Sequence, residues 1–320
     1  MRFNERMFTY TSILAVLAPV FILIGIGAVL RKANWLNHNA DELLFRIVIN
    51  IFYPALVIES IIGRETLRDP KVLILAPLLG SAIVAARYLF CWGVAKITRF
   101  PHHQQRSFAF AASSINAGFI GIPLAMGLFD KDTLAVYIVC CAGADMTYWA
   151  LAGTVSEQFT KIDWRKIFNI PFLAIFLSSV VNLVHPIKEL PYVIQQTLNI
   201  LGSCYLIGVI LIGSLAAELL MQPHSRPSIK TMFIGGATHT LILPLLMIVA
   251  LRYLPIINEL KSSYLIFASI CSALSAFMVV KYYKGHAPTA FAITLTTAIL
   301  SIVTTPLWIK FGFAFLNLSK

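Results

Sequence analysis

The sequence predicts an all-α polytopic membrane protein with ten transmembrane helices. Of its 320 residues, 58% are hydrophobic and only 12% are charged, and the mean hydropathy is +0.81. An apolar run of about 18 residues or more is long enough to cross the hydrocarbon core of a bilayer. Ten such runs lie between charged clusters, at residues 8–30, 41–62, 70–95, 104–128, 132–157, 167–185, 192–220, 229–253, 262–283 and 288–315. The connections between them are short, so we expect no appended catalytic or nucleotide-binding domain.

The first two spans carry residues that we expect to shape helix packing. The first holds Pro19, Gly25 and Gly27, and small residues let two helices approach closely. It has no small-residue cleavage site, so we expect a retained helix and not a signal peptide. In the second span, Pro54 lacks an N–H group and should leave the carbonyl one turn earlier free, close to Asn50.

Two ionisable side chains lie deep inside apolar spans, Arg87 in the third and Asp145 in the fifth. A charge at the bilayer centre costs at least about 2.5–3.5 kcal/mol on insertion scales, so each is a candidate functional residue. Two interpretations stay open: a structural ion pair between them, or a role in coupling, with Asp145 as the proton carrier. Glu59 and Glu218 lie near span ends, where we expect solvated carboxylates. His239 in the eighth span is either a proton relay or a partner in an interhelical hydrogen bond.

Helix-breaking residues interrupt the fourth span. A helix broken at membrane depth is tolerated only where it is buried in protein or lines a wet cavity. An opened turn at Asn116, Ala117 and Gly118 would present backbone N–H groups and a partial positive charge to an anion. The alternative is a kink, at Gly121 and Pro123, where two helices cross tightly.

The chain divides into two halves of five spans each. Residues 1–157 hold the first five, residues 158–166 form a polar linker that we expect on the cytoplasmic side, and residues 167–320 hold the other five. Because five is odd, the second half enters the membrane in the opposite sense, as in an inverted-topology repeat. The fourth span then corresponds to the ninth. The polar residues in the middle of the ninth span are Ser269, Cys271, Ser272 and Ser275.

The formal net charge is +11, and the basic residues are spread over loops on both faces of the predicted bundle. No groove or motif for nucleic acid accompanies them, so we attribute the charge to contact with lipid headgroups. The face that holds the loop after the first span carries twelve Lys and Arg residues, against eleven on the opposite face. By the positive-inside rule, this excess places both termini outside the cytoplasm.

The cysteines and the absence of catalytic motifs narrow the function classes. The five cysteines, Cys91, Cys140, Cys141, Cys204 and Cys271, fall within predicted spans, and none has metal-ligand spacing. We therefore expect no disulfide, no metal site and no cofactor. No Ser/His, paired-aspartate or His-Glu-x-x-His constellation is present, so we expect no catalytic residues and a protein that is not an enzyme.

The motif Asn116-x4-Gly121-Ile122-Pro123-Leu124 resembles the fourth helix of the auxin efflux carrier family, which includes plant auxin exporters and bacterial permeases. The resemblance covers nearly the full length of the chain. Supporting matches are, in chain order, Pro19, Gly25-x-Gly27, Arg31-Lys32, Trp35-Leu36, Asn50-x3-Pro54-Ala55-Leu56, Gly213-Ser214-Leu215, Lys281-x-Tyr283 and the segment Thr294–Pro306.

The resemblance implies two inverted five-helix repeats, with helices four and nine broken where they cross and the substrate held beside that crossover. By this resemblance Asn116 is a ligand for the carboxylate of an organic anion, and Asn50 and Pro54 flank the same region. The family commonly has a proline at the break of helix nine, where this chain has Cys271 followed by Ser272. We expect a milder second break, or one formed by serine hydroxyls that bond the backbone. Cys271 and Ser272 complete the predicted substrate site.

The sequence therefore predicts a secondary transporter in a bacterial cell membrane, which moves a small organic anion, a mono- or dicarboxylate, by alternating access. Two alternatives are a sodium-coupled symporter of the same crossover fold and a membrane sensor that binds without flux. The expected partners are the substrate and membrane lipid, with a second copy of the chain, as a homodimer, the candidate protein partner. The coupling ion and the direction of transport are left open.

Overall fold

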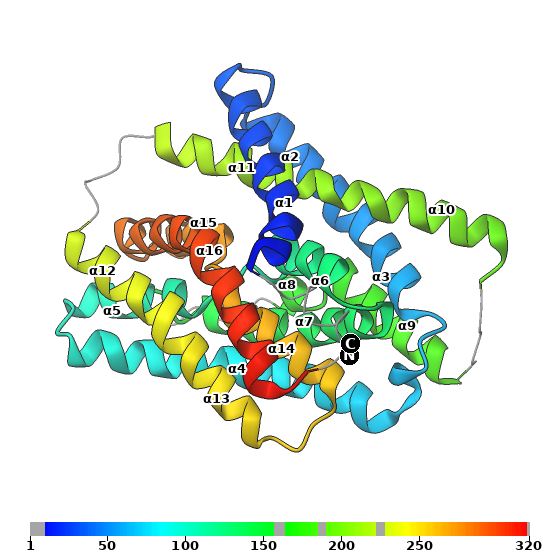
Figure 1. Ribbon diagram of the computed structural model, residues 1–320. Coiled ribbons are helices and arrows are strands. Elements are labelled where there is room, and N and C mark those ends of the chain that lie inside the picture. Colours follow the sequence, from blue (N-terminus) through cyan, green and yellow to red (C-terminus); the bar gives the residue numbers. More distant parts are fainter. Residues whose placement is uncertain (1–9, 157–163, 185–189, 222–227, 319–320) are drawn as a thin grey trace.

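The computed structural model describes residues 10–156, 164–184, 190–221 and 228–318, and the regular elements in these ranges are helical (Figure 1). The α-helices are α1 (Tyr10–Lys32), α2 (His38–Ile47), α3 (Tyr53–Ile61), α4 (Pro70–Ile97), α5 (His102–Ser113), α6 (Ile122–Leu128), α7 (Lys131–Ala152), α8 (Trp164–Ile167), α9 (Ile170–Val184), α10 (Tyr192–Ser203), α11 (Ile207–Met221), α12 (Ile229–Ala237), α13 (Leu243–Tyr253), α14 (Asn258–Ser269), α15 (Leu274–Tyr282) and α16 (Ala287–Leu316).

Eight helical segments in the described ranges are long and apolar enough to cross a membrane. They are Tyr10–Lys32, His38–Ile61, Pro70–Ile97, His102–Leu128, Lys131–Ala152, Tyr192–Met221, Ile229–Tyr253 and Ala287–Leu316. The pair α14 and α15, bent by 66°, adds a ninth if it is one span. At the predicted sixth span, α9 is apolar but has only 15 residues. The all-helical, multi-span class is confirmed, whereas the number ten and the inverted repeat stay predictions.

The predicted linker, residues 158–166, lies mostly outside the described residues, and its last three residues belong to the short helix α8. Lys166 in α8 lies over the rings of Tyr282, at 4.2 Å from the centroid, and of Tyr283, at 5.2 Å. This cation–π contact attaches the segment between the two halves to the end of α15.

Three spans contain a widened, π-helical turn that ends two residues before a proline. The turns are Val48–Phe52, Ala117–Gly121 and Thr238–Ile242, and the prolines are Pro54, Pro123 and Pro244. Proline has no N–H group to give to the carbonyl four residues earlier, and its ring clashes with that carbonyl. A wider turn relieves the clash without ending the helix. The predicted disturbance beside Asn50 is thus present as a π-helical turn.

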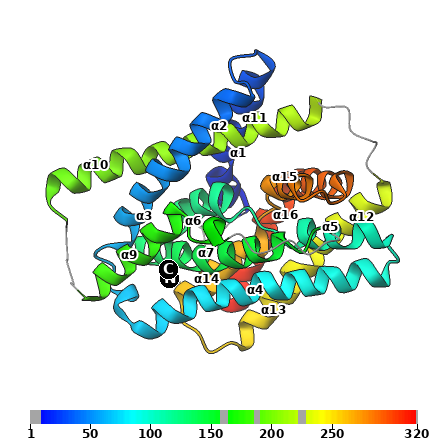
Figure 2. The same ribbon diagram turned by 180° about the vertical axis from the view of Figure 1, so that it is seen from behind.

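The helices pack in two groups, each with segments from both sides of residues 158–166. In the first, which we call the scaffold bundle, α1 packs along α11, and α3 packs against α9 and α10. In the second, the crossover bundle, α4 packs against α5 and α7, and α16 packs against α5, α12, α14 and α15. Figures 1 and 2 show α10 and α11 on one side of the molecule and α4 and α13 on the opposite side. Contacts of α1 with α6 and α16, and of α3 with α7, join the groups.

Close helix packing in the scaffold bundle depends on glycine. A Cβ atom added at Gly27 of α1 would collide with the backbone of Ile210 in α11, and one added at Gly213 would collide with the backbone of Ile24. A Cβ atom at Gly25 would meet nothing within 4 Å. The predicted small-residue face therefore holds for Gly27 and fails for Gly25.

We predict that Gly27→Ala lowers the thermal stability of the detergent-solubilised protein, because backbone must move to admit the methyl group. Overpacking of this kind costs about 1–3 kcal/mol. Gly25→Ala is the matched control on the same helix and should melt as the wild type does or slightly higher. Thermal unfolding followed by tryptophan fluorescence measures both. Equal melting temperatures for Gly27→Ala and the wild type would contradict the close approach of α1 and α11.

Candidate functional site

Two helices break and meet in the crossover bundle. The chain leaves α5 at Ser114 (φ −63°, ψ 153°) and re-enters a helical turn at Ala117, and α14 ends at Ser269 while α15 begins at Leu274. The backbone N–H of Asn116 donates to the carbonyl of Cys271 at 2.9 Å. The two breaks are therefore hydrogen-bonded to each other through their backbones.

The second break is sharp although it contains no proline. α14 and α15 meet at 66°, so the expectation of a milder break is wrong. Hydroxyl groups satisfy carbonyls at the ends of both broken helices: Thr305 Oγ1 donates to the Ser269 carbonyl at the end of α14 at 2.7 Å, and Ser272 Oγ donates to the Ala111 carbonyl near the end of α5 at 2.7 Å. Ser272 Oγ also lies 2.8 Å from Ser114 Oγ. Serine and threonine hydroxyls, which compete well for backbone groups, therefore bond the backbone at a break that has no proline, as the second of the two alternatives expected.

Arg87 is directed at the end of α5 and not at Asp145. Its Nε donates to the Ser113 carbonyl at 2.9 Å, its Nη1 donates to the sulfur of Met247 at 3.2 Å, and its Nη2 lies 3.2 Å from His239 Nδ1. Of the two interpretations left open, the ion pair between Arg87 and Asp145 is therefore wrong in the part of the chain that the structure describes. The low-dielectric interior makes an unpaired cation costly, and here the helix carbonyls, which carry partial negative charge, offset that cost.

Two helix beginnings lie where the breaks meet. The turn that starts at Ala117 directly follows Asn116, and Leu274, where α15 starts, lines the same cavity as Asn116. The first N–H groups of a helix have no partner within it, and they carry a partial positive charge. The crossover therefore presents hydrogen-bond donors, together with the amide of Asn116.

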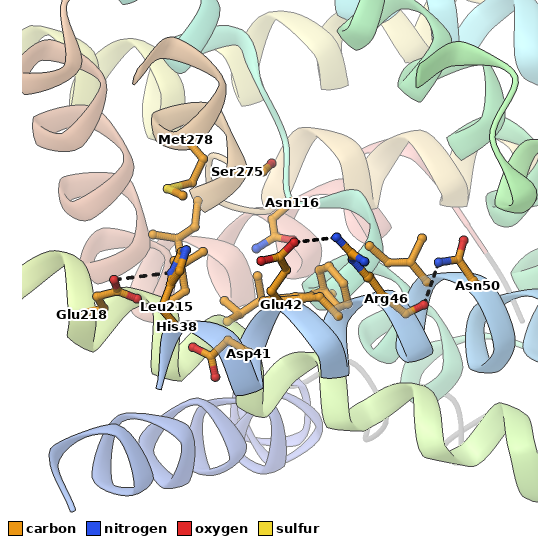
Figure 3. A pocket seen from close by; sticks show the side chains of 15 residues that line it. His38, Asp41, Glu42, Arg46, Asn50, Asn116, Leu215, Glu218, Ser275 and Met278 are labelled. Carbon is orange, nitrogen blue, oxygen red and sulfur yellow. Dashed lines mark hydrogen bonds and ion pairs between the residues drawn. The ribbon is translucent and has the colours of Figure 1, made fainter. Parts of the chain in front are cut away.

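A cavity of about 430 Å³ opens between the scaffold bundle and the crossover (Figure 3). Asn116, Phe119 and Ser275 line its crossover wall, and Phe45 and Ile49 of α2 with its π-helical turn line the facing wall. Figure 3 shows Asn116 and Ser275 on the side opposite α2. The cavity thus reaches from the beginning of α2 to the crossover.

Charged residues around the mouth of this cavity are paired. Glu42 and Arg46 form an exposed ion pair at 2.7 Å, and His38 Nδ1 lies 3.8 Å from Glu218. Arg31 contacts both Glu218 and Asp41, the latter at 3.1 Å. The expectation of a solvated Glu218 is wrong, because its side chain is only 22% exposed and belongs to this buried network.

Of the predicted site residues, Asn116 and Asn50 line the large cavity. The Asn50 side-chain nitrogen is engaged, since it donates to the Arg46 carbonyl at 2.8 Å. Ala117 and Asp145 line a second, smaller cavity of about 50 Å³, which shares Ser275 with the first. The structure therefore brings Asp145 to the crossover without an ionic partner among the described residues.

The remaining predicted residues at the crossover pack behind those that line its cavities. Cys271 and Ser272 are buried, at 2% and 1% exposure, and neither lines a cavity at the crossover. Gly118 lies against the hydroxyl of Tyr205. A Cβ atom at Gly121 would collide with Tyr137, whose hydroxyl donates to the Ala117 carbonyl at 2.8 Å.

Sequence reasoning missed the importance of Ser275 and Phe119. Ser275 lies one turn beyond Cys271, and only its place after the end of the break distinguishes it from other polar residues of the ninth span. Among the residues that the structure describes, no group of three His, Cys, Asp or Glu side chains could hold a metal ion. The five cysteines are free thiols.

Thiol labelling tests whether the cavity reaches the crossover. In a chain whose other cysteines are replaced, we predict that Ser275→Cys reacts with a charged, water-soluble thiol reagent at least about tenfold faster than Cys271 in the same setting, because reaction follows exposure of the thiolate. Ser275 is exposed to the cavity and Cys271 is buried. Equal rates for the two positions would show that water does not reach Ser275 selectively.

Comparison with known proteins agrees with this architecture. The family model described as "Membrane transport protein" matches residues 12–156 and 154–309. An uncharacterized transporter of Methanothermobacter thermautotrophicus is 26% identical over 299 residues, which cover 90% of this chain and 95% of the relative. The chain belongs to the membrane transport protein family, the auxin efflux carrier family that its fourth-span motif resembles.

Proposed function

We propose that the chain is a secondary transporter that moves a small organic anion by alternating access and catalyses no chemical reaction. Its family makes it a membrane transport protein. The observation that carries the anion proposal is the convergence of the Asn116 amide and two helix beginnings, at Ala117 and Leu274, on the crossover. Partial positive charge and aligned N–H groups at helix beginnings stabilise carboxylates in transporters of this design.

The charged groups at the mouth of the cavity offset one another in large part. Glu42 is paired with Arg46, whereas Asp41 and Glu218 share one arginine, Arg31. With His38 neutral, the mouth therefore carries one excess negative charge, which a protonated His38, 3.8 Å from Glu218, would balance. The hydrogen-bond donors that favour an anion lie deeper, at the crossover.

The cavity walls favour one carboxylate on an apolar body. Seven of the fifteen residues that line the cavity are apolar: Phe45, Ile49, Phe119, Ile212, Leu215, Leu274 and Met278. The two basic side chains that line it, His38 and Arg46, each lie within 4 Å of a glutamate. A second carboxylate on the substrate would find no uncommitted cation among the described lining residues. We therefore favour a monocarboxylate over a dicarboxylate.

Alternating access needs a closed end opposite the open mouth, and aromatic rings supply it. Phe119 stacks on Tyr205 at 5.4 Å between ring centroids, and Tyr205 stacks on Tyr53 at 5.2 Å. The Phe119 ring also packs against Gly208, where a Cβ atom would collide with it. Rotation of the crossover bundle against the scaffold bundle would open this stack while closing the mouth. In the proposed orientation, with both termini outside the cytoplasm, the mouth of the cavity would open to the cytoplasm.

Asp145 is the proposed proton carrier. It lies at membrane depth, where an ionised carboxylate is costly, and it lines the small cavity that meets the substrate cavity at Ser275. A proton exchanged there would neutralise it during part of the transport cycle. A sodium-coupled cycle is the competing version of this proposal, and dependence on the imposed gradient separates the two.

Substitution of Asn116 tests the substrate site. We predict that Asn116→Ala raises the KM for uptake of labelled indole-3-acetate into proteoliposomes about ten- to a hundredfold, because the loss of hydrogen bonds to a charged group costs about 1.5–3 kcal/mol. Uptake is the measurement because one proton carried with one monocarboxylate moves no net charge. Asn199→Ala, at an exposed position on α10, is the matched control and should keep the wild-type KM. Malonate, with two carboxylates, should be taken up more slowly than indole-3-acetate. A wild-type KM in Asn116→Ala would remove this residue from the site.

Substitution of Asp145 tests coupling. We predict that Asp145→Asn loses accumulation driven by a pH gradient but keeps exchange of labelled for unlabelled anion, because a permanently neutral side chain cannot release a proton. Asp69→Asn is the control: Asp69 caps α4 by accepting from the Lys71 N–H at 2.9 Å, and asparagine caps a helix equally well. Retained proton-driven accumulation in Asp145→Asn, or accumulation that follows a sodium gradient instead, would contradict the assignment.

A further inference from the structure

The broken helices end in carbonyl groups that need partners. The last four carbonyl groups of an α-helix accept no hydrogen bond from an N–H group of that helix. At membrane depth, no lipid group can donate to them either. At the end of α5, the Phe110 carbonyl accepts from the Ser114 N–H at 3.1 Å, and the Ala111 carbonyl accepts from Ser114 Oγ at 2.9 Å. The next two carbonyls, of Ala112 and Ser113, have partners outside this helix.

Arg87 and His239 supply those partners from two other helices. Arg87 Nε donates to the Ser113 carbonyl at 2.9 Å. His239 Nδ1 lies 2.8 Å from the Ala112 carbonyl, and its Nε2 lies 3.0 Å from the Ile270 carbonyl in the second break. One imidazole ring thus reaches both broken spans.

The neutral imidazole ring of His239 can donate a hydrogen bond to a carbonyl at the end of either broken helix. With its hydrogen on Nε2, neutral His239 donates to the Ile270 carbonyl and accepts from Arg87 at Nδ1, which lies 3.2 Å from Nη2. With its hydrogen on Nδ1, it donates to the Ala112 carbonyl. Arg87 caps the Ser113 carbonyl in both cases.

These contacts lie close in the chain to the residues that join the two breaks. Ile270 precedes Cys271, whose carbonyl accepts the Asn116 N–H, and Ser113 lies three residues before Asn116. A shift of either carbonyl would therefore move Asn116 and the beginning of α15 relative to each other. Arg87 itself lines neither crossover cavity. It is 2% exposed and borders a separate apolar cavity between α4 and α13.

We propose that Arg87 and His239 are positioning residues that hold the two broken spans in register by capping both truncated helices, and so fix the anion site without touching the anion. The part of this proposal that concerns substrate affinity rests on the proposed function. The part that concerns the register of the breaks does not, because it depends only on the hydrogen bonds of the backbone.

The native Cys271 is a probe of that register. It lies between the Ile270 carbonyl and Ser272, and it is buried. In a chain with Cys91, Cys140, Cys141 and Cys204 changed to serine, labelling by a small maleimide reports whether the breaks have separated. We expect His239→Phe, which removes both contacts, to label at least about tenfold faster than the parent, a ratio that corresponds to about 1.4 kcal/mol. His239→Gln and Arg87→Lys, which keep some donors, should label at intermediate rates.

The kinetics of transport are the second measurement. We expect the KM for the anion to rise about tenfold in Arg87→Lys and His239→Gln, with a smaller change in kcat, because the site is displaced while the carrier still cycles. A merely structural role would lower the amount of active carrier and leave KM unchanged. Arg252→Lys is the matched control, because Arg252 Nη1 also donates to a carbonyl near a helix end, that of Phe315 at 3.0 Å, but far along α16 from the crossover.

The outcomes separate the two proposals. Faster labelling without transport of any carboxylate by the parent would support the positioning role and contradict the anion carrier. Parental labelling rates and parental KM in folded His239→Gln and Arg87→Lys would overturn the positioning role. If His239→Phe does not fold, these two conservative variants, which keep polar groups in place, decide the result.

Discussion

Hydrogen bonding of the interrupted backbone at the crossing of two helices is the constraint on which this structure depends. The Asn116 N–H bonds the Cys271 carbonyl at 2.9 Å, so each break satisfies part of the other. An unpaired backbone group in a lipid environment costs several kcal/mol. Helices broken at this depth are therefore stable only together, and they need polar side chains brought from elsewhere in the fold. Thr305 of α16 and Ser272 are two such side chains.

At the crossover, the carbonyl ends of the helices have different neighbours from the N–H ends. The carbonyl ends are capped by protein groups, among them the guanidinium of Arg87 and the imidazole of His239. The N–H ends, at Ala117 and Leu274, begin beside the cavities. Capping one kind of end within the protein leaves the other for a ligand of negative charge. This asymmetry explains how Arg87, which looks like an isolated buried charge in the sequence, could support the proposed anion site without lining it.

Local sequence signals were sufficient to predict where helices form and where the first break lies. Apolar runs predicted the eight long spans found in the described residues, although the predicted number of ten is not confirmed. The combination of Asn116 with Gly121 and Pro123 predicted the interruption, because those residues act on their own backbone. The partner of Arg87 was not predictable, since it is set by the packing of α4 against α5 and by a π-helical turn far along the chain. The sharp bend of α14 and α15 was missed for the same reason: it is held by hydroxyls such as that of Thr305 and not by a local proline. Glu218 was misjudged because its partner, Arg31, lies on another helix.

The most direct test of the account is the position of a bound carboxylate. Magic-angle-spinning NMR of the protein in lipid, with 15N-labelled asparagine and arginine and an aromatic monocarboxylate labelled with 13C at its carboxyl carbon, measures 13C–15N proximity. The account predicts a contact of about 4 Å or less between the carboxyl carbon and the Asn116 side-chain nitrogen, the separation that one hydrogen bond gives. A carboxylate in contact with the guanidinium of Arg46 at the mouth, and not with Asn116, would contradict it.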